Sequence, residues 1–149
     1  MKPKHYNRFM FFKLPAAWWS GVRLKALDQN QAEVSIRLNW FNKNPFKSMF
    51  WACQGMAAEF STGVLVMEKI RSSNHAISML VAQNKATFSK KATGMIRFNC
   101  NQGARIDQAI ADTIESGKGQ KFSLSANGID QNGAIVSHFE FEWTIKLKA

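Results

Sequence analysis

The segment from Ser48 to Met67, SMFWACQGMAAEFSTGVLVM, carries a single charged side chain, that of Glu59. A helix this apolar has to be covered on nearly every side when the chain folds. A carboxylate within it loses its water shell, which costs free energy unless a partner compensates. Burial also raises the pKa of a carboxyl group and makes its ionised form a better base, so Glu59 is the first candidate for a functional residue. The alternative is a structural glutamate, exposed on the helix or hydrogen-bonded at a subunit interface.

The same segment has nearly the length of a membrane-spanning helix, but its composition argues against one. It contains Gln54, Ser61 and Thr62 besides its acid, and an acid at the centre of a span costs about 2.5–3.5 kcal/mol. We therefore expect a buried core helix and no membrane span. The apolar run FMFF near the amino terminus is too short for a secretory signal, and Lys13 ends it. We expect a cytoplasmic protein.

The length of 149 residues predicts a single domain over residues 1–149, because domains cluster at about 100–150 residues. The net charge of +10 favours anionic partners such as nucleic acid, a membrane surface or a phosphate-bearing small molecule. The basic residues are scattered, however, and the pair formed by Lys90 and Lys91 is among the densest spots. No basic run typical of a nucleic-acid-binding arm is present, so we expect no nucleic acid partner.

Neither the cysteines nor the histidines form a catalytic or metal-binding motif. Cys53 and Cys100 lie far apart, which predicts free thiols in a reducing compartment. With His5, His75 and His138 they show no spacing typical of zinc ligands, so we expect no metal. The chain also lacks the nucleophile elbow of a serine hydrolase.

Hydrophobic periodicity predicts a helix, two strands, the long apolar helix, and then four strands with a short helix inserted. Pro3 and Pro15 suit the start and stop of the first helix, and AAWWSG reads as a turn-rich hinge. Ser48 is expected to cap the long helix. The expected helices cover residues 4–14, 49–71 and 106–115. The expected strands cover residues 22–27, 31–40, 75–88, 94–100, 120–129 and 135–147, with hairpin turns at DQNQ and DQNG.

Strands segregated from one long helix indicate an α+β protein with an antiparallel sheet wrapped on that helix. One sheet covers only part of the circumference of so apolar a helix. A second subunit can cover the rest, so we expect a homodimer, or a tetramer built from dimers. One narrow face of the helix, with mostly small side chains, suits close packing against a sheet or a partner. That face carries Ala52, Gly55, Glu59, Thr62 and Val66.

This order of elements, around a nearly all-apolar helix with one acid, resembles the hotdog fold. Within that fold the chain is similar to the acyl-CoA thioesterase-like proteins and to the DUF4442 family. The resemblance spans essentially the whole chain and implies one long central helix wrapped by an antiparallel sheet, an extra N-terminal helix and a short inserted helix. It rests on NPFKSMFWACQGMAAEFSTG, ATFSKKATG and GQKFSLSANGIDQNGAIVSHFEFEWTIK.

Thioesterases of this type carry Asn-x-x-Gly-x-x-His-Gly-Gly, followed by an acid fifteen residues after the asparagine. Asn44 matches the asparagine and Glu59 the acid. Lys47 stands at the first glycine, Phe50 at the histidine and Trp51 at the next glycine. The glycine that directly follows the histidine lets a thioester carbonyl approach backbone N–H groups at the helix start. A tryptophan at this position would crowd that approach.

The resemblance implies hydrolysis of acyl thioesters such as acyl-CoA, with Glu59 as general base or nucleophile and Asn44 orienting the water or the substrate. It implies no cofactor, because coenzyme A enters as part of the substrate. It also implies that the partner subunit supplies the second half of the site, often a serine or threonine on the strand after the helix. Val81 lies nearest that position here, so the sequence shows no such hydroxyl. The residues expected to bind the acyl chain or the phosphates of coenzyme A are Phe46, Phe50, Trp51, Met56, Ser89, Lys90 and Lys91.

Two other functions are left open by the sequence. The missing His-Gly-Gly element favours a non-catalytic protein that binds acyl chains or lipids in the same pocket. The net charge and the aromatic residues suggest nucleic-acid binding, but the charges do not cluster and the aromatic residues alternate as core positions do.

Overall fold

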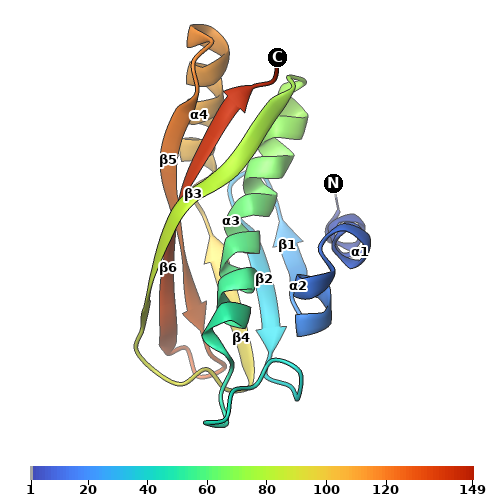
Figure 1. The fold of residues 1–149 in the computed structure, drawn as a ribbon, viewed down its shortest axis with the longest axis vertical. Coiled ribbons are helices and arrows are strands. Elements are labelled where there is room, and N and C mark those ends of the chain that lie inside the picture. Colours follow the sequence, from blue (N-terminus) through green and yellow to red (C-terminus); the bar gives the residue numbers. More distant parts are fainter. Residues whose placement is uncertain (1) are drawn as a thin grey trace.

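The computed structural model describes residues 2–149 and contains one six-stranded antiparallel sheet, in the strand order β1-β2-β4-β5-β6-β3 (Figure 1). The helices are α1 (Pro3–Lys13), α2 (Pro15–Ser20), α3 (Trp51–Ser73) and α4 (Gly103–Ser116). The strands are β1 (Arg23–Leu27), β2 (Ala32–Arg37), β3 (Ile77–Phe88), β4 (Met95–Cys100), β5 (Gln120–Ile129) and β6 (Ile135–Leu147). The α+β class is confirmed, and so is the predicted order of elements, apart from the additional helix α2.

The sheet curves along the length of α3, which lies on one of its faces (Figure 1). Between them lies the core, where Phe98 on β4 and Phe139 on β6 are buried with their rings 5.9 Å apart. The indole Nε1–H of Trp143 donates to the hydroxyl of Thr62 at 3.0 Å, which fixes the helix against β6. Among residues 2–149, none of the helices is both long and apolar enough to cross a membrane.

The start of α3 differs from the prediction. The helix begins at Trp51 with Phe50 as its N-cap residue, and no side chain caps it. The backbone before it is held instead by a β-bridge between Lys43 and Met49. Ser48 is therefore not the cap: its hydroxyl contacts the side chain of Asn44, inside the preceding loop.

The segment AAWWSG is helical, which corrects the prediction of a hinge. Pro15 does not only end α1 but also begins α2, since proline is well suited to the first position of a helix. The helix α2 ends at Gly21, whose φ of 101° is readily adopted only by glycine.

The second strand is shorter than the alternation of residues 31–40 predicts. It ends at Arg37, because the side chains of Asn39 and Asn42 each accept a hydrogen bond, at 2.9 Å, from the other's backbone N–H group. This exchange forms a tight turn in place of further strand. Trp40, which the alternation places on the same face as Val34 and Ile36, is exposed on that turn.

Two glycines of α3 differ in what a side chain would meet. A Cβ at Gly55 would lie 3.5 Å from the ring of Phe139, an ordinary contact, whereas a Cβ at Gly63 would lie 3.2 Å from the ring of Trp143. Alanine stabilises a helix interior by about 1 kcal/mol over glycine. We expect Gly55→Ala to raise the free energy of unfolding by up to about 1 kcal/mol, and Gly63→Ala to raise it less or to lower it. Urea unfolding measures both, and equal gains would contradict the close approach of Trp143.

Candidate active site

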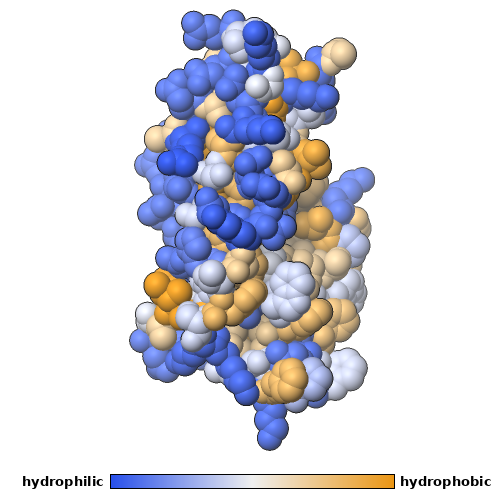
Figure 2. Space-filling view, turned by 60° about the vertical axis from the view of Figure 1, so that its left-hand side comes forward, coloured by the Kyte–Doolittle hydropathy of each residue, from blue (hydrophilic) through white to orange (hydrophobic). Residues whose placement is uncertain are grey.

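An apolar hollow of about 530 Å³ lies at the N-terminal end of α3. It forms where the loop before the helix, the first turns of the helix and the segment after β3 meet. In Figure 2 apolar residues gather over the lower part of the molecule, where Figure 1 places this end of α3. The hollow is lined by Asn44, Pro45, Phe46, Ser48, Met49, Phe50, Trp51, Gln54, Phe88, Lys90, Lys91 and Ala92. Six of the residues predicted for the site are therefore brought together here.

The amide of Asn44 organises the loop before α3. Its Oδ1 accepts hydrogen bonds from the backbone N–H groups of Phe46 at 2.8 Å and of Ser48 at 3.2 Å. Its Nδ2 donates to the Ser48 hydroxyl at 3.0 Å. The side chain of Asn44 is thus occupied in shaping the wall of the hollow.

Lys47 lies in this loop with a φ of 63°, in the left-handed region that favours glycine. It stands at the position where the thioesterase motif has its first glycine. The backbone at this position thus has a conformation that glycine adopts readily and lysine rarely.

Backbone N–H groups at the start of α3 point toward the open end of the helix. The N–H groups of Cys53 and Gln54 donate to the carbonyl oxygen of Phe50 at 2.9 and 3.3 Å. Those of Trp51 and Ala52 have no acceptor among residues 2–149, as the first groups of a helix commonly do not. With the positive end of the helix dipole, they can stabilise a developing negative charge.

The side chain of Trp51 does not fill the hollow. It is 56% exposed and packs edge-on against the ring of Phe50, with centroids 6.1 Å apart. The indole therefore forms part of the rim.

Glu59 lies two turns further along α3 and is half-buried. Its carboxylate has no hydrogen-bond or ion-pair partner among residues 2–149; the nearby hydroxyl of Thr62 donates to the backbone carbonyl of Glu59 instead. Desolvation raises the pKa of Glu59 above its ordinary value of 4.5. This side chain does not line the hollow within one chain.

Gln54 is a site residue that the sequence analysis missed. It lines the hollow, only 4% of its surface is exposed, and its buried Oε1 has no partner among residues 2–149. A buried polar atom without a partner is costly, so Gln54 offers an unused acceptor to a molecule in the hollow. An amide in an otherwise apolar helix start was the signal that could have found it.

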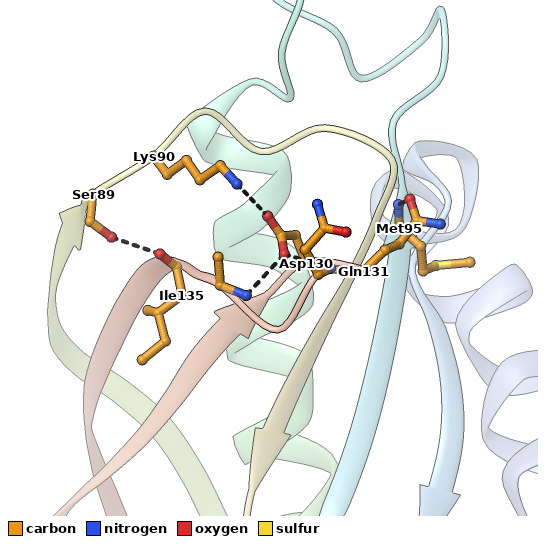
Figure 3. A network of polar contacts seen from close by, with 8 residues as sticks. Ser89, Lys90, Met95, Asp130, Gln131 and Ile135 are labelled. Carbon is orange, nitrogen blue, oxygen red and sulfur yellow. Dashed lines mark hydrogen bonds and ion pairs between the residues drawn. The ribbon is translucent and has the colours of Figure 1, made fainter.

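The segment after β3 is tied to the hairpin between β5 and β6 (Figure 3). Lys90 forms an ion pair of 2.9 Å with Asp130, whose pKa this contact lowers, and the Ser89 hydroxyl donates to the carbonyl of Ile135 at 3.0 Å. Lys91 donates to the carbonyl of Phe46 at 3.3 Å and links the two loops that border the hollow. Ser89 lies outside the hollow's lining, and the ammonium group of Lys91 has no acidic partner among residues 2–149.

Met56 is half-buried on α3 and packs against the core instead of lining the hollow. Cys53 and Cys100 are buried free thiols, and burial raises the pKa of each. The described part of the chain holds no cluster of three or more histidine, cysteine or acidic side chains that could bind a metal.

The sheet order, the central α3 and the hollow at its start define a hotdog fold of the thioesterase-like kind. The chain belongs to the DUF4442 family, because the family model described as "Domain of unknown function (DUF4442)" matches residues 3–145. No curated protein matches the chain.

Several solved structures share the fold. The Pseudomonas aeruginosa protein PA5026, described as a protein of unknown function and a probable thioesterase, is 22% identical with a TM-score of 0.82, over 98% of this chain and 97% of that one. A putative thioesterase from Shewanella oneidensis is 11% identical with a TM-score of 0.80, over 98% and 97%. The Staphylococcus aureus protein SAV0944 was solved as two variants, each 12% identical to this chain. The glutamate-to-alanine variant has a TM-score of 0.67 over 85% of this chain and 94% of that one. The glutamine-to-alanine variant has a TM-score of 0.66 over 84% of this chain and 93% of that one. At these identities the likeness shows the fold alone.

The raised pKa of Glu59 predicts how stability depends on pH. The folded chain holds the proton more tightly than the unfolded chain, so stability falls as pH rises from 4.5 through the folded-state pKa. Glu59→Gln removes the ionisable group and with it this loss of stability at high pH. We expect the Tm of the variant to exceed that of the wild type at about pH 8, and the gap to close toward about pH 4.

Thermal unfolding across that pH range measures the gap, and the same substitution at the exposed Glu115 of α4 is the matched control. A gap that is absent at neutral pH, or that widens in acid, would show that the Glu59 carboxylate is compensated.

Proposed function

We propose that the protein hydrolyses acyl thioesters, acyl-CoA among them, with Glu59 as general base or nucleophile. The observation that carries the proposal is the Glu59 carboxylate, half-buried on an apolar helix without a partner among residues 2–149. Structural carboxylates in such surroundings are normally paired, whereas a base benefits from the raised pKa that desolvation gives it. The thioesterase-like fold supports this role for Glu59.

The free N–H groups at the start of α3 are the proposed oxyanion donors. Trp51 and Glu59 are eight residues apart on one helix, which separates them by about 12 Å along its axis. A base and an oxyanion donor both have to lie within about 3 Å of the reacting groups. The two halves of one site therefore come from two copies of the chain, with the acid of one α3 facing the helix start of the other.

A second copy of the chain would also cover an unpaired strand edge and exposed apolar side chains. β3 ends the sheet order, so its outer edge pairs with no other strand among residues 2–149. An unpaired edge of 12 residues is a template for another strand, and Leu80 on it is exposed. Phe46, Phe50 and Phe88 around the hollow are exposed as well, and burying such a surface is typical of a subunit interface.

The spacing of two residues gives further support. In the S. aureus protein the two alanine substitutions replace a glutamine and a glutamate fifteen positions apart. Asn44 and Glu59 are separated by the same number of residues. In our proposal Asn44 acts by holding the loop that borders the substrate.

The chemical steps follow from these positions. Glu59 takes a proton from a water molecule as the water oxygen attacks the thioester carbonyl carbon. The N–H groups of Trp51 and Ala52 stabilise the negative charge that develops on the carbonyl oxygen. The tetrahedral intermediate then collapses and the C–S bond breaks. The leaving thiolate takes up the proton that Glu59 holds, which returns Glu59 to its ionised form. The aromatic residues around the hollow contact the acyl chain, and Lys91 contacts phosphate groups of coenzyme A.

A second candidate function is acyl binding without turnover, in the same hollow. It is favoured by the Trp51 side chain, which stands on the rim where the thioesterase motif has a glycine. Measurements of turnover and of ligand-dependent thermal stability on the same acyl-CoA thioesters separate the two functions.

The activity test compares a panel of acyl-CoA thioesters with wild type, Glu59→Gln and two variants of Trp51. Phe50 has φ −59° and ψ 132°, a conformation compatible with a following proline, and Trp51 is the first helical residue. Trp51→Pro therefore removes one N–H donor with little change in the backbone, and Trp51→Ala is its matched control. We expect kcat to fall about 10²–10⁴-fold in Glu59→Gln and about 10²–10³-fold in Trp51→Pro.

Trp51→Ala keeps the N–H group and opens the rim, so its kcat should equal or exceed that of the wild type. Wild-type turnover that survives Glu59→Gln would remove the proposed mechanism. Acyl-CoA that stabilises the wild type against heat without being hydrolysed would establish the binding protein instead.

A further inference from the structure

The two N-terminal helices present exposed apolar side chains that the proposed site does not use, beside Trp18, which is partly buried against the core. We call this surface the α1–α2 corner; it consists of Phe11, Phe12, Leu14, Trp18 and Trp19. Phe12 is 66% and Trp19 62% exposed, and Phe11 lies between them. Its ring centroid is 5.0 Å from that of Phe12, 5.4 Å from that of Trp18 and 6.4 Å from that of Trp19. The corner is therefore one continuous apolar surface.

The corner belongs to a segment of the chain that is rich in positive charge. Residues 2–27 contain no aspartate or glutamate. Arg8 is exposed one helical turn before Phe12, and Lys13 directly follows it. The basic side chains of this region are Lys2, Lys4, Arg8, Lys13, Arg23 and Lys25. This region therefore holds much of the chain's excess of 20 basic over 10 acidic residues.

The corner is held rigidly on the fold. The Asn7 side chain exchanges two hydrogen bonds with the backbone of Leu24 on β1, at 2.8 and 3.0 Å. Tyr6 donates to Glu68 on α3 at 2.5 Å, and Met10 is fully buried. Figure 1 shows α1 and α2 together beside β1, at the opposite end of the sheet order from β3. The exposed rings thus belong to a docked element, and their exposure is a property of the folded chain.

We propose that the α1–α2 corner binds the surface of anionic phospholipid membranes. Aromatic side chains, tryptophan above all, favour the boundary between lipid headgroups and acyl chains, and a helix with apolar residues beside basic ones lies in that boundary. The arginine and lysine side chains contact the anionic headgroups. A patch with rings and excess positive charge matches this partner better than a second copy of the chain, whose own corner carries the same charge. The interaction involves no membrane-spanning segment and does not depend on thioester hydrolysis.

The test is sedimentation with vesicles of phosphatidylcholine alone or mixed with phosphatidylglycerol. We expect the wild type to bind the mixed vesicles at low salt at least about tenfold more tightly than the neutral ones, and the difference to shrink at high salt. Phe12→Glu combined with Trp19→Glu should lower binding to the mixed vesicles about tenfold or more. Replacement of Lys4, Arg8 and Lys13 by glutamine should reduce binding toward the level on neutral vesicles.

The control is Ile135→Glu, which places one negative charge, against two in the corner variant, on an exposed apolar residue of β6, away from the corner. It should bind as the wild type does, and circular dichroism checks that every variant is folded. Equal loss in the control and in the corner variant, or wild-type binding that does not depend on phosphatidylglycerol, would overturn the proposal. The proposal would also be overturned if the wild type bound no lipid and light scattering without vesicles showed that it self-associates through the corner.

Discussion

The structure depends on one constraint: residues 51–67 of α3 carry a single charged side chain, and one sheet covers only part of that stretch. The buried side of α3 packs against β2, β4, β5 and β6 and carries most of the core residues of the helix. A stripe that includes Ala52, Gly55, Met56 and Glu59 stays half-exposed. The proposed base Glu59 lies on this stripe, and the proposed oxyanion donors lie at the helix start beside the hollow.

The same constraint explains the chemistry. A carboxylate on the uncovered margin of an apolar helix is already partly desolvated in one chain, and covering that margin with a second copy removes more of its water. The helix start is uncovered for a different reason, because no side chain caps it and two N–H groups have no acceptor among residues 2–149. In one chain the base and these donors are too far apart to act on one carbonyl. Covering α3 and completing the site are therefore the same event in our proposal.

The fold was predictable because its signals are local and strong. The alternation in β5 and β6, the Asp130 turn between them and the apolar run of α3 each specify one element. The predictions failed where tertiary contacts decide the backbone. Ser48 precedes an apolar run and looks like a cap, but the bridge between Lys43 and Met49 directs its hydroxyl to Asn44.

Less of the site was predictable. Glu59 could be found because it is the one charge in its segment, and the lining residues around Trp51 follow from proximity in sequence. Gln54 stood out only as an amide in an apolar helix start, since nothing in the sequence shows that its Oε1 is left without a partner. The pairing of Lys90 with Asp130 was also invisible, because the two residues are forty positions apart and are joined by the sheet.

The most direct test of a site shared between two chains is complementation by two inactive variants. Chains carrying Glu59→Gln and chains carrying Trp51→Pro are co-expressed, purified as mixed dimers through two different tags, and compared with each parent. If the acid of one chain serves the helix start of the other, each mixed dimer has one intact site and about half the wild-type activity. Mixed dimers no more active than either parent would contradict a site built from two copies.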